Sequence, residues 1–130
     1  MGSEMCIRDS YSISAFSALT GFSIHTLRFY EKEGILIPQR RANNHRSYSA
    51  RDAEWVAFIT RLKETGMPLK SIKHYADLRA QGEETAQARM DLLLAHSGVL
   101  QQQIAVLNDH FQHLEKKIDY YRDLLTTAVI

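Results

Sequence analysis

An unbroken heptad of apolar side chains runs through the last third of the chain, and it limits the possible fold more than any other feature. From Met90 onward the seam residues alternate steps of three and four: Met90, Leu93, Ser97, Leu100, Ile104, Leu107, Phe111, Leu114, Ile118, Tyr121 and Leu125. A seam with this period is buried only against a partner helix. The one weak position in this heptad is Ser97-Gly98, which either loosens the helix or allows a close approach of its partner. The sequence therefore predicts a coiled-coil dimerisation helix at 81–130, with these contact residues: Leu93, Leu100, Ile104, Leu107, Phe111, Leu114, Ile118 and Tyr121.

A second pattern, ISAFSALTGFSIHTLRFYEKEG at residues 13–34, predicts two short helices joined by a tight turn. Apolar residues recur at helical spacing in the first of them: Ile13, Phe16 and Leu19. Gly21 stands where the chain must turn sharply, and Ser23 is a suitable cap for the second helix. This order is typical of a helix-turn-helix, although an ordinary helical hairpin is the alternative.

Residues 34–49 predict a short hairpin, in which Ile35, Leu36 and Ile37 favour strand and Ala42-Asn43-Asn44 supplies the turn. Several basic side chains bracket that turn, namely Arg40, Arg41, His45 and Arg46. Tyr48 then returns toward the body of the domain. Cations and a phenol in this arrangement fit the phosphates of a nucleic acid, so we interpret residues 34–49 as a basic wing.

Two further helices are predicted after the wing. The first opens at Arg51-Asp52 and carries a core stripe at helical spacing, made of Trp55, Phe58, Ile59 and Leu62. Gly66 ends it, and Pro68 is expected just inside the start of the next helix. The buried stripe of that helix is expected at Leu69, Ile72 and Tyr75 or Ala76.

Charge divides the chain at about the same place as the patterns do. The formal net charge is only +1, but residues 11–80 hold 11 Lys and Arg against six acids, whereas residues 81–130 hold four bases against seven acids. A basic front and an acidic rear are typical of a head that binds a polyanion, followed by a separate assembly element.

The chain has a single cysteine, Cys6, which excludes an internal disulfide and any multi-cysteine metal site within this sequence. No run of residues is apolar enough to span a membrane, and no membrane partner is expected. Residues 1–10, MGSEMCIRDS, show neither a helical nor a strand period, so we expect a non-native or disordered leader there.

Three separate segments together resemble one family. TLRFYEKEGILIP, then QRRANNHRSYS, then RDAEWVAFITRLKETGMPLKSIK are similar, in this order, to the MerR family of bacterial transcription regulators. The resemblance covers nearly all of residues 11–80. It implies a mostly α fold, with a winged helix-turn-helix head at 11–80 and an antiparallel coiled coil formed by the long helix.

The resemblance also implies which residues meet DNA. We expect Arg28, His25 and Thr26 of the second helix to face base edges or phosphates in the major groove. Phe29 and Tyr30 occupy the family's DNA-facing aromatic pair, with Tyr30 expected at the backbone and core packing as the alternative for both. Lys63 and Lys70 resemble the family's second wing. The complete predicted contact set is His25, Thr26, Arg28, Phe29, Tyr30, Arg40, Arg41, His45, Arg46, Tyr48, Lys63 and Lys70.

The partners that the resemblance implies are double-stranded promoter DNA, a second copy of the chain and, indirectly through the promoter, RNA polymerase. Family members bind an inverted repeat in an overlong promoter spacer and distort it, so that polymerase engages both promoter elements. A stress-responsive, cytoplasmic, nucleoid-associated bacterial regulator is the resulting expectation.

The sequence says little about an effector, and no cofactor or metal is expected. EWVAFITRLKETGM and IDYYRDLL resemble the short aldehyde- and stress-responsive branch, in which a reactive cysteine lies in the third helix. Arg61 stands in its place here. The other candidates are His96, His110 and His113, and the heptad places the last two beside the seam, which favours a surface or packing role.

A coiled-coil interaction protein whose basic head binds protein or RNA is the alternative to a DNA-binding regulator. Enzymatic function is not expected, because the sequence has no Ser/His/Asp or Cys/His constellation and no Gly-rich phosphate loop.

Overall fold

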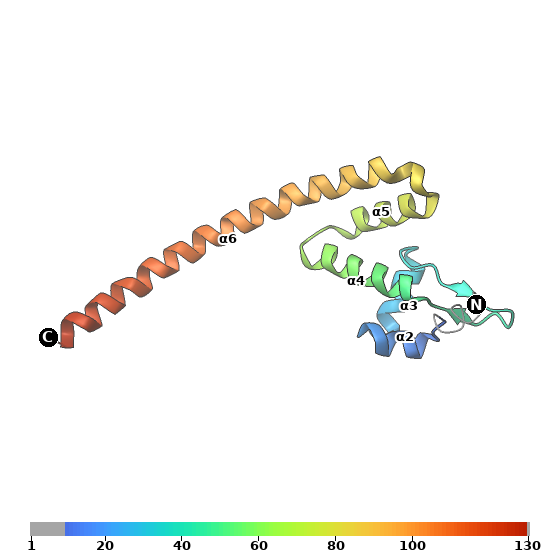
Figure 1. Cartoon of the computed structure of the whole chain (residues 1–130), viewed down its shortest axis with the longest axis horizontal. Helices are drawn as coiled ribbons and strands as arrows, with labels where there is room; N and C mark the ends of the chain where they lie inside the picture. Colours follow the sequence, from blue (N-terminus) through green and yellow to red (C-terminus); the bar gives the residue numbers. More distant parts are fainter. Residues whose placement is uncertain (1–9, 130) are drawn as a thin grey trace. The chain divides into compact units, whose positions relative to one another are not determined.

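The structure is a computed structural model that describes residues 10–129. The expected leader therefore lies outside the described residues except for Ser10. The chain divides into two compact units, Met1–Leu92, called the head below, and Leu93–Ile130, called the tail (Figure 1). The division falls between Leu92 and Leu93, inside the long helix at Ala86–Val129, whereas the sequence analysis drew it between residues 80 and 81 by charge and pattern.

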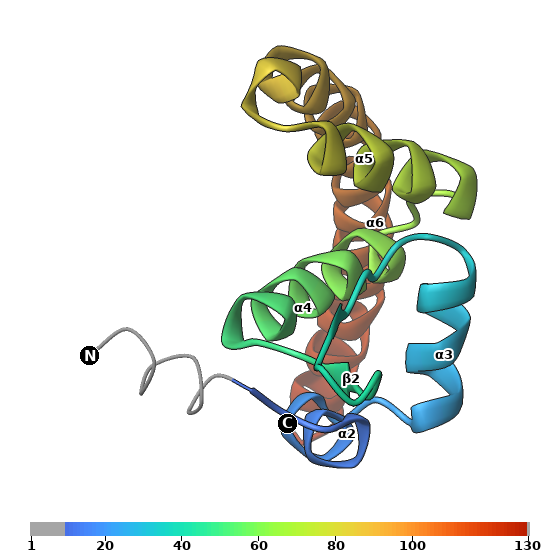
Figure 2. The ribbon, with the colours of Figure 1, turned by 90° about the vertical axis from the view of Figure 1, so that its right-hand side faces the viewer.

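The head begins with the predicted pair of short helices, α2 at Ile13–Thr20 and α3 at Ile24–Lys32. Each has a serine cap, since Ser12 accepts the Ala15 N–H and Ser23 accepts the Thr26 N–H. Gly21 ends α2 with φ 79°, a left-handed conformation that favours glycine. Figure 2 shows α3 at one edge of the head beside α2 and the wing.

The helical spacing of Ile13, Phe16 and Leu19 correctly predicted α2, but within this stripe Phe16 is fully buried whereas Leu19 is 53% exposed. The helix is only eight residues long, and Phe16 is its one buried side chain. The Phe16 ring packs on the Tyr48 ring, with 4.6 Å between the ring centroids.

The wing is an antiparallel pair of very short strands, β1 at Gln39–Arg40 and β2 at Arg46–Ser47. The prediction of strand at residues 35–37 is wrong. Ile35 and Leu36 are instead buried as the chain leaves α3, and the Ile35 carbonyl accepts a hydrogen bond from Trp55 Nε1 at 2.8 Å. Their apolar side chains therefore serve the core of the head and not the hairpin.

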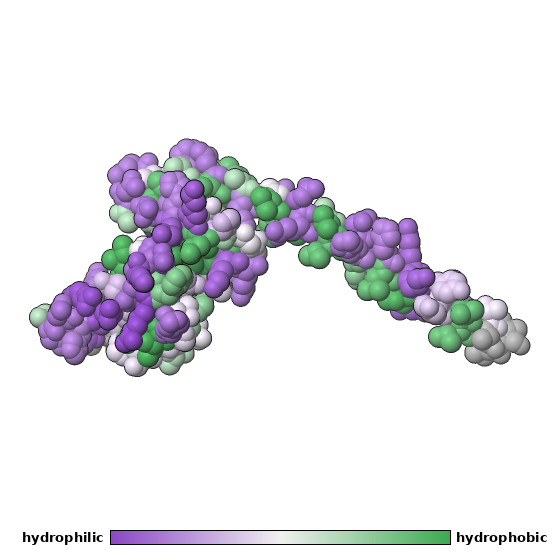
Figure 3. All heavy atoms as spheres, turned by 180° about the vertical axis from the view of Figure 1, so that it is seen from behind, coloured by the Kyte–Doolittle hydropathy of each residue, from purple (hydrophilic) through white to green (hydrophobic). Residues whose placement is uncertain are grey.

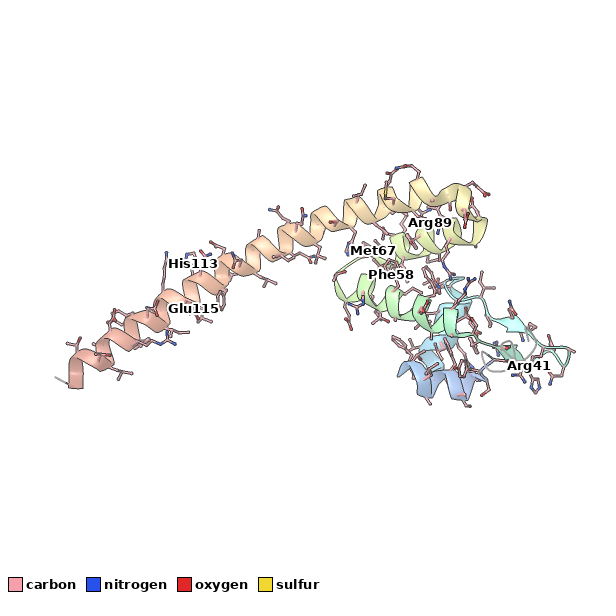
Figure 4. The ribbon with its side chains drawn as sticks, in the orientation of Figure 1. Arg41, Phe58, Met67, Arg89, His113 and Glu115 are labelled. Carbon is pink, nitrogen blue, oxygen red and sulfur yellow. The ribbon has the colours of Figure 1, made fainter. Side chains whose placement is uncertain are left out.

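Helix α4 spans Ala50–Glu64 and α5 spans Leu69–Gln81. Ser49 and Asp52 form a reciprocal capping box at the start of α4. Pro68 lies one residue outside α5 as its N-cap, and not just inside it as expected. Most of the predicted core is confirmed, whereas Phe58 is half-buried and Leu69 exposed. The buried side chains of this helix pair are Trp55, Val56, Ile59, Leu62, Met67, Ile72, Tyr75 and Ala76, with Met67 in the connection between the helices (Figure 4).

A short 3-10 turn, η1 at Glu83–Thr85, leads into α6 at Ala86–Val129, a single helix of 44 residues. The heptad prediction of a long helix is thus confirmed, without a break at Ser97-Gly98. Its apolar side chains are solvent-exposed along the tail, with Leu107 at 67%, and Figure 3 shows hydrophobic and hydrophilic residues alternating there. Among the described helices, none is long and apolar enough to cross a membrane.

Candidate nucleic-acid interface

One face of α3 points to solvent and carries basic, imidazole and aromatic side chains. His25, Arg28, Phe29 and Lys32 are all exposed, and their spacing of three and four places them in a single stripe. Leu27 and Tyr30 lie on the opposite side and are buried. Phe29 is 40% exposed, so the prediction that it is accessible agrees with the structure.

Thr26 stands beside the cap and not in the middle of this stripe. Its backbone N–H donates to Ser23 Oγ at 3.1 Å, and its own Oγ1 accepts the Ser23 hydroxyl at 3.0 Å. The Thr26 hydroxyl is therefore half-buried and already used as an acceptor within the helix start. Toward a base edge it keeps its O–H donor and one acceptor lone pair.

Tyr30 does not lie where the sequence analysis expected it. It is 2% exposed, and burial raises the pKa of its hydroxyl. Phe22 meets the Tyr30 ring edge-on, with ring centroids 6.3 Å apart. The expected contact between Tyr30 and the DNA backbone is therefore wrong. Tyr30 is a core residue, because its ring is buried on the inner side of α3.

Glu31 joins α3 to the wing. Its carboxylate accepts a hydrogen bond from the Tyr48 hydroxyl, and Arg46 Nε lies 2.8 Å from Glu31 Oε2. The Glu31 side chain is only 11% exposed, so solvent screens this pair weakly. Arg46 thus fixes the wing against α3, and only the rest of its guanidinium is left for a phosphate.

Tyr48 is also a core residue and not a wing contact. It is 1% exposed, stacks on Phe16, and exchanges two backbone hydrogen bonds with Tyr11, at 2.8 and 2.9 Å. Burial raises the pKa of its hydroxyl, and the hydrogen bond to Glu31 raises it further. The prediction that Tyr48 lies along phosphates is therefore wrong, because its ring is buried against Phe16 and its hydroxyl already donates to Glu31.

Helix α3 and the wing enclose a basic hollow. It has a volume of about 500 Å³ and its cations come from both elements: Arg28 and Lys32 from α3, and Arg40 and Arg46 from the strands. The one carboxylate on its lining is Glu31, which is already paired with Arg46. The surplus positive charge makes this surface, called the groove face below, suitable for a phosphate backbone.

The other predicted cations lie around the groove face. Arg41 and His45 are exposed at the wing turn, where Figure 4 shows Arg41. Arg40 Nη1 donates to the Asn44 carbonyl at 3.1 Å, which holds the turn. Lys63 near the end of α4 and Lys70 near the start of α5 are both exposed.

Two residues of this surface were missed by sequence reasoning. Lys32 belongs to the exposed stripe, and its spacing of four from Arg28 could have revealed it. Glu31 was missed because its partners, Tyr48 and Arg46, lie far from it in the sequence, and no local sequence pattern predicts that they meet. Sequence reasoning also missed the ion pair between Lys73 Nζ and Glu33 Oε2, which are 2.9 Å apart and connect α5 to the C-terminal end of α3.

A metal site finds no support in the part of the chain that the structure describes, where no group of three or more His, Cys, Asp or Glu side chains is placed to hold an ion. His113 Nδ1 lies 2.9 Å from the Asp109 carbonyl oxygen one turn earlier, which is a contact within the helix.

Two family models match the chain. The MerR HTH family regulatory protein model covers residues 11–78, and the MerR DNA-binding model covers residues 53–117. An HTH-type transcriptional regulator of Haemophilus influenzae is 33% identical over 114 residues, which is 87% of this chain and 84% of that protein. The regulator YyaN of Bacillus subtilis is 31% identical over 132 residues, covering 92% of this chain and 96% of YyaN.

Solved structures agree with these matches. HiNmlR, a MerR family regulator lacking the sensor domain and crystallised with promoter DNA, is 33% identical with a TM-score of 0.76, over 88% of this chain and 91% of its own. A MerR family regulator from Listeria monocytogenes is 30% identical with a TM-score of 0.84, over 92% and 91%. Together with the winged helix-turn-helix head, these matches show that the chain belongs to the MerR family and is a DNA-binding transcriptional regulator of that type.

Proposed function

We propose that the head binds duplex promoter DNA with α3 in the major groove and the wing along the flanking phosphates. The observation that carries this proposal is the exposed stripe of His25, Arg28, Phe29 and Lys32 next to the basic wing. An α-helix fits the major groove, and an arginine there bonds a guanine edge bidentately. Arg28 is the principal base-reading residue, with His25 and Thr26 nearer the helix start.

Phosphate contacts surround this reading helix. Arg40, Arg41 and His45 supply them from the wing. Lys63 at the end of α4 and Lys70 at the start of α5 supply further ones, as does Lys32 of α3. Such contacts fix the position of the protein on DNA but carry no sequence information.

The functional unit is a homodimer held by α6. Exposed apolar residues at heptad spacing support this assembly, since a monomer would leave Leu107, Phe111 and Leu114 in water. The two copies of α6 pair in antiparallel orientation, so that residues 81–130 form the dimer and residues 11–80 bind DNA. The proposed seam is Leu93, Leu100, Ile104, Leu107, Phe111, Leu114, Ile118 and Tyr121. A twofold dimer reads an inverted repeat, one half-site for each copy of α3.

Transcription is controlled through the shape of the promoter. The dimer binds within the spacer and distorts it, and RNA polymerase responds to the altered spacing without having to touch the regulator. Deforming a site of this size costs several kcal/mol, which the phosphate contacts offset. The promoter DNA bound by HiNmlR supports the promoter as the target of this chain. The protein acts at the bacterial nucleoid and has no role as an enzyme.

Footprinting on a library of promoter-spacer duplexes at two salt concentrations tests the proposal. We expect a protected inverted repeat, with affinity falling steeply as salt rises. Binding without sequence preference would contradict it and would favour a coiled-coil interaction protein with a basic head. An Arg28→Ala variant is the matched control, because it should lose the pattern of protection while remaining dimeric.

A further inference from the structure

A second basic hollow lies on the other side of the wing from the groove face. Its volume is about 540 Å³, and its lining includes Ser10, Arg40, Arg41, Ser47, Arg51 and Arg79. The strand register pairs Arg40 with Arg46 and Gln39 with Ser47, and successive residues of a strand point to opposite faces. Arg46 lines the groove face, whereas Gln39 and Ser47 line this second hollow, called the arginine hollow below.

The positive charge of the arginine hollow is largely uncompensated. Arg40, Arg41, Arg51 and Arg79 form no ion pair within the described residues, and the single carboxylate on the lining is Asp52. Asp52 is already committed to the start of α4, since its Oδ2 accepts the Ser49 N–H at 2.9 Å. Four arginines therefore line a hollow whose only carboxylate already accepts a backbone hydrogen bond.

Neutral partners hold the guanidinium groups in place. Arg41 Nη2 donates to Ser10 Oγ at 2.6 Å, and Ser10 Oγ lies 2.7 Å from Ser47 Oγ. The Arg79 guanidinium stands over the Trp55 ring, 4.2 Å from its centroid. These contacts orient the groups without neutralising them, and most of the N–H donors of each arginine are left for a ligand.

We propose that the arginine hollow binds a phosphate group. Guanidinium forks match phosphate oxygens in geometry and charge, and the hydrogen-bonded pair Ser10 and Ser47 leaves one hydroxyl proton as a neutral donor. The phosphate could belong to a free small molecule or to the DNA backbone. Because the hollow faces away from α3, a free phosphate-bearing molecule fits the geometry better than the duplex that α3 holds.

Arg40 connects this site to the groove face, since it lines both hollows. A ligand in the arginine hollow competes with a DNA phosphate for the Arg40 guanidinium, so ligand binding weakens the contact between the wing and DNA. This coupling rests on the proposed DNA-binding function, whereas the phosphate site itself does not.

Trp55 is the only tryptophan in the chain and provides the signal for a test. The full-length protein is titrated with pyrophosphate at constant ionic strength, and the Trp55 fluorescence is followed. We expect a saturable change, weakened at least ten-fold by Arg51→Ala. Arg61→Ala removes an exposed arginine of the same helix outside the hollow, and it should leave the titration unchanged.

Duplex binding by the same preparations identifies the source of the phosphate. Saturable pyrophosphate binding with unchanged duplex affinity of Arg51→Ala assigns the site to a free molecule. Loss of duplex affinity in Arg51→Ala, larger than in Arg61→Ala, assigns it to a DNA phosphate. A linear, variant-independent response to pyrophosphate, together with normal duplex binding by Arg51→Ala, would overturn the site. Failure of the wild-type protein to bind any duplex would instead overturn the proposed function.

Discussion

Replacing Tyr48 with phenylalanine tests whether the wing is held to the recognition helix through Glu31. The substitution keeps the ring and its stacking on Phe16, and removes only the hydroxyl that donates to the Glu31 carboxylate. A hydrogen bond to a charged group contributes about 1.5–3 kcal/mol to stability. Because Tyr48 is 1% exposed and the Glu31 side chain only 11%, solvent does not replace the lost donor. Arg46 remains beside Glu31 and limits the cost, so we expect the free energy of unfolding to fall by about 2 kcal/mol.

Urea unfolding at one fixed protein concentration measures this change, since a dimer's stability depends on concentration. Tyr120→Phe is the matched control, because it removes a hydroxyl from an exposed tyrosine of the tail and should change stability by less than about 0.5 kcal/mol. Equal stabilities of the Tyr48→Phe and Tyr120→Phe variants would refute the reasoning and would mean that the Tyr48 hydroxyl is not needed to hold the wing.

Four further outcomes follow from the same structure. Arg28→Ala should weaken operator binding by about 1–3 kcal/mol, measured by fluorescence anisotropy, while Arg61→Ala should not change it. Lys32→Ala should weaken binding equally on all duplexes and reduce the salt slope by about 1; a sequence-dependent loss would instead make Lys32 a base reader. Leu107→Glu should yield monomers by sedimentation, and a stable dimer would contradict the seam. Since burial raises the pKa of Tyr48 in the folded protein, the unfolded chain loses this proton first, at about pH 10. The contribution is therefore complete below that pH and falls progressively as the pH rises from there toward the higher pKa of the folded state. The stability difference between wild type and Tyr48→Phe should shrink on going from pH 8 to about pH 11, and an unchanged difference would argue against this.

The helices could be predicted because their signals are local. Ser23 and Gly21 mark the ends of α3 and α2 through cap chemistry that depends on a few neighbouring residues. The heptad of α6 repeats often enough that Gly98 did not obscure it. Periodicity of this kind is independent of how the elements pack.

The errors arose where tertiary packing decided the outcome. Ile35 and Leu36 have strand propensity, but both are buried in the core, and the Ile35 carbonyl accepts a hydrogen bond from Trp55. Tyr30 and Tyr48 carry hydroxyls typical of nucleic-acid contacts, yet both are buried. The role of Glu31 depends on Arg46 and Tyr48, which are 15 and 17 positions away along the chain, and no local pattern encodes that meeting.

The two sides of α3 differ in how freely they can change over evolutionary time. Leu27, Tyr30 and Glu31 serve the core and the wing, so a mutation at any of them perturbs the whole head. His25, Arg28, Phe29 and Lys32 are exposed, so a new side chain there would leave the fold of the head intact and, under the proposed function, would change the DNA sequence that α3 binds. After a gene duplication, the two copies would therefore acquire different operators through this exposed set, while the inner side of the same helix stays fixed.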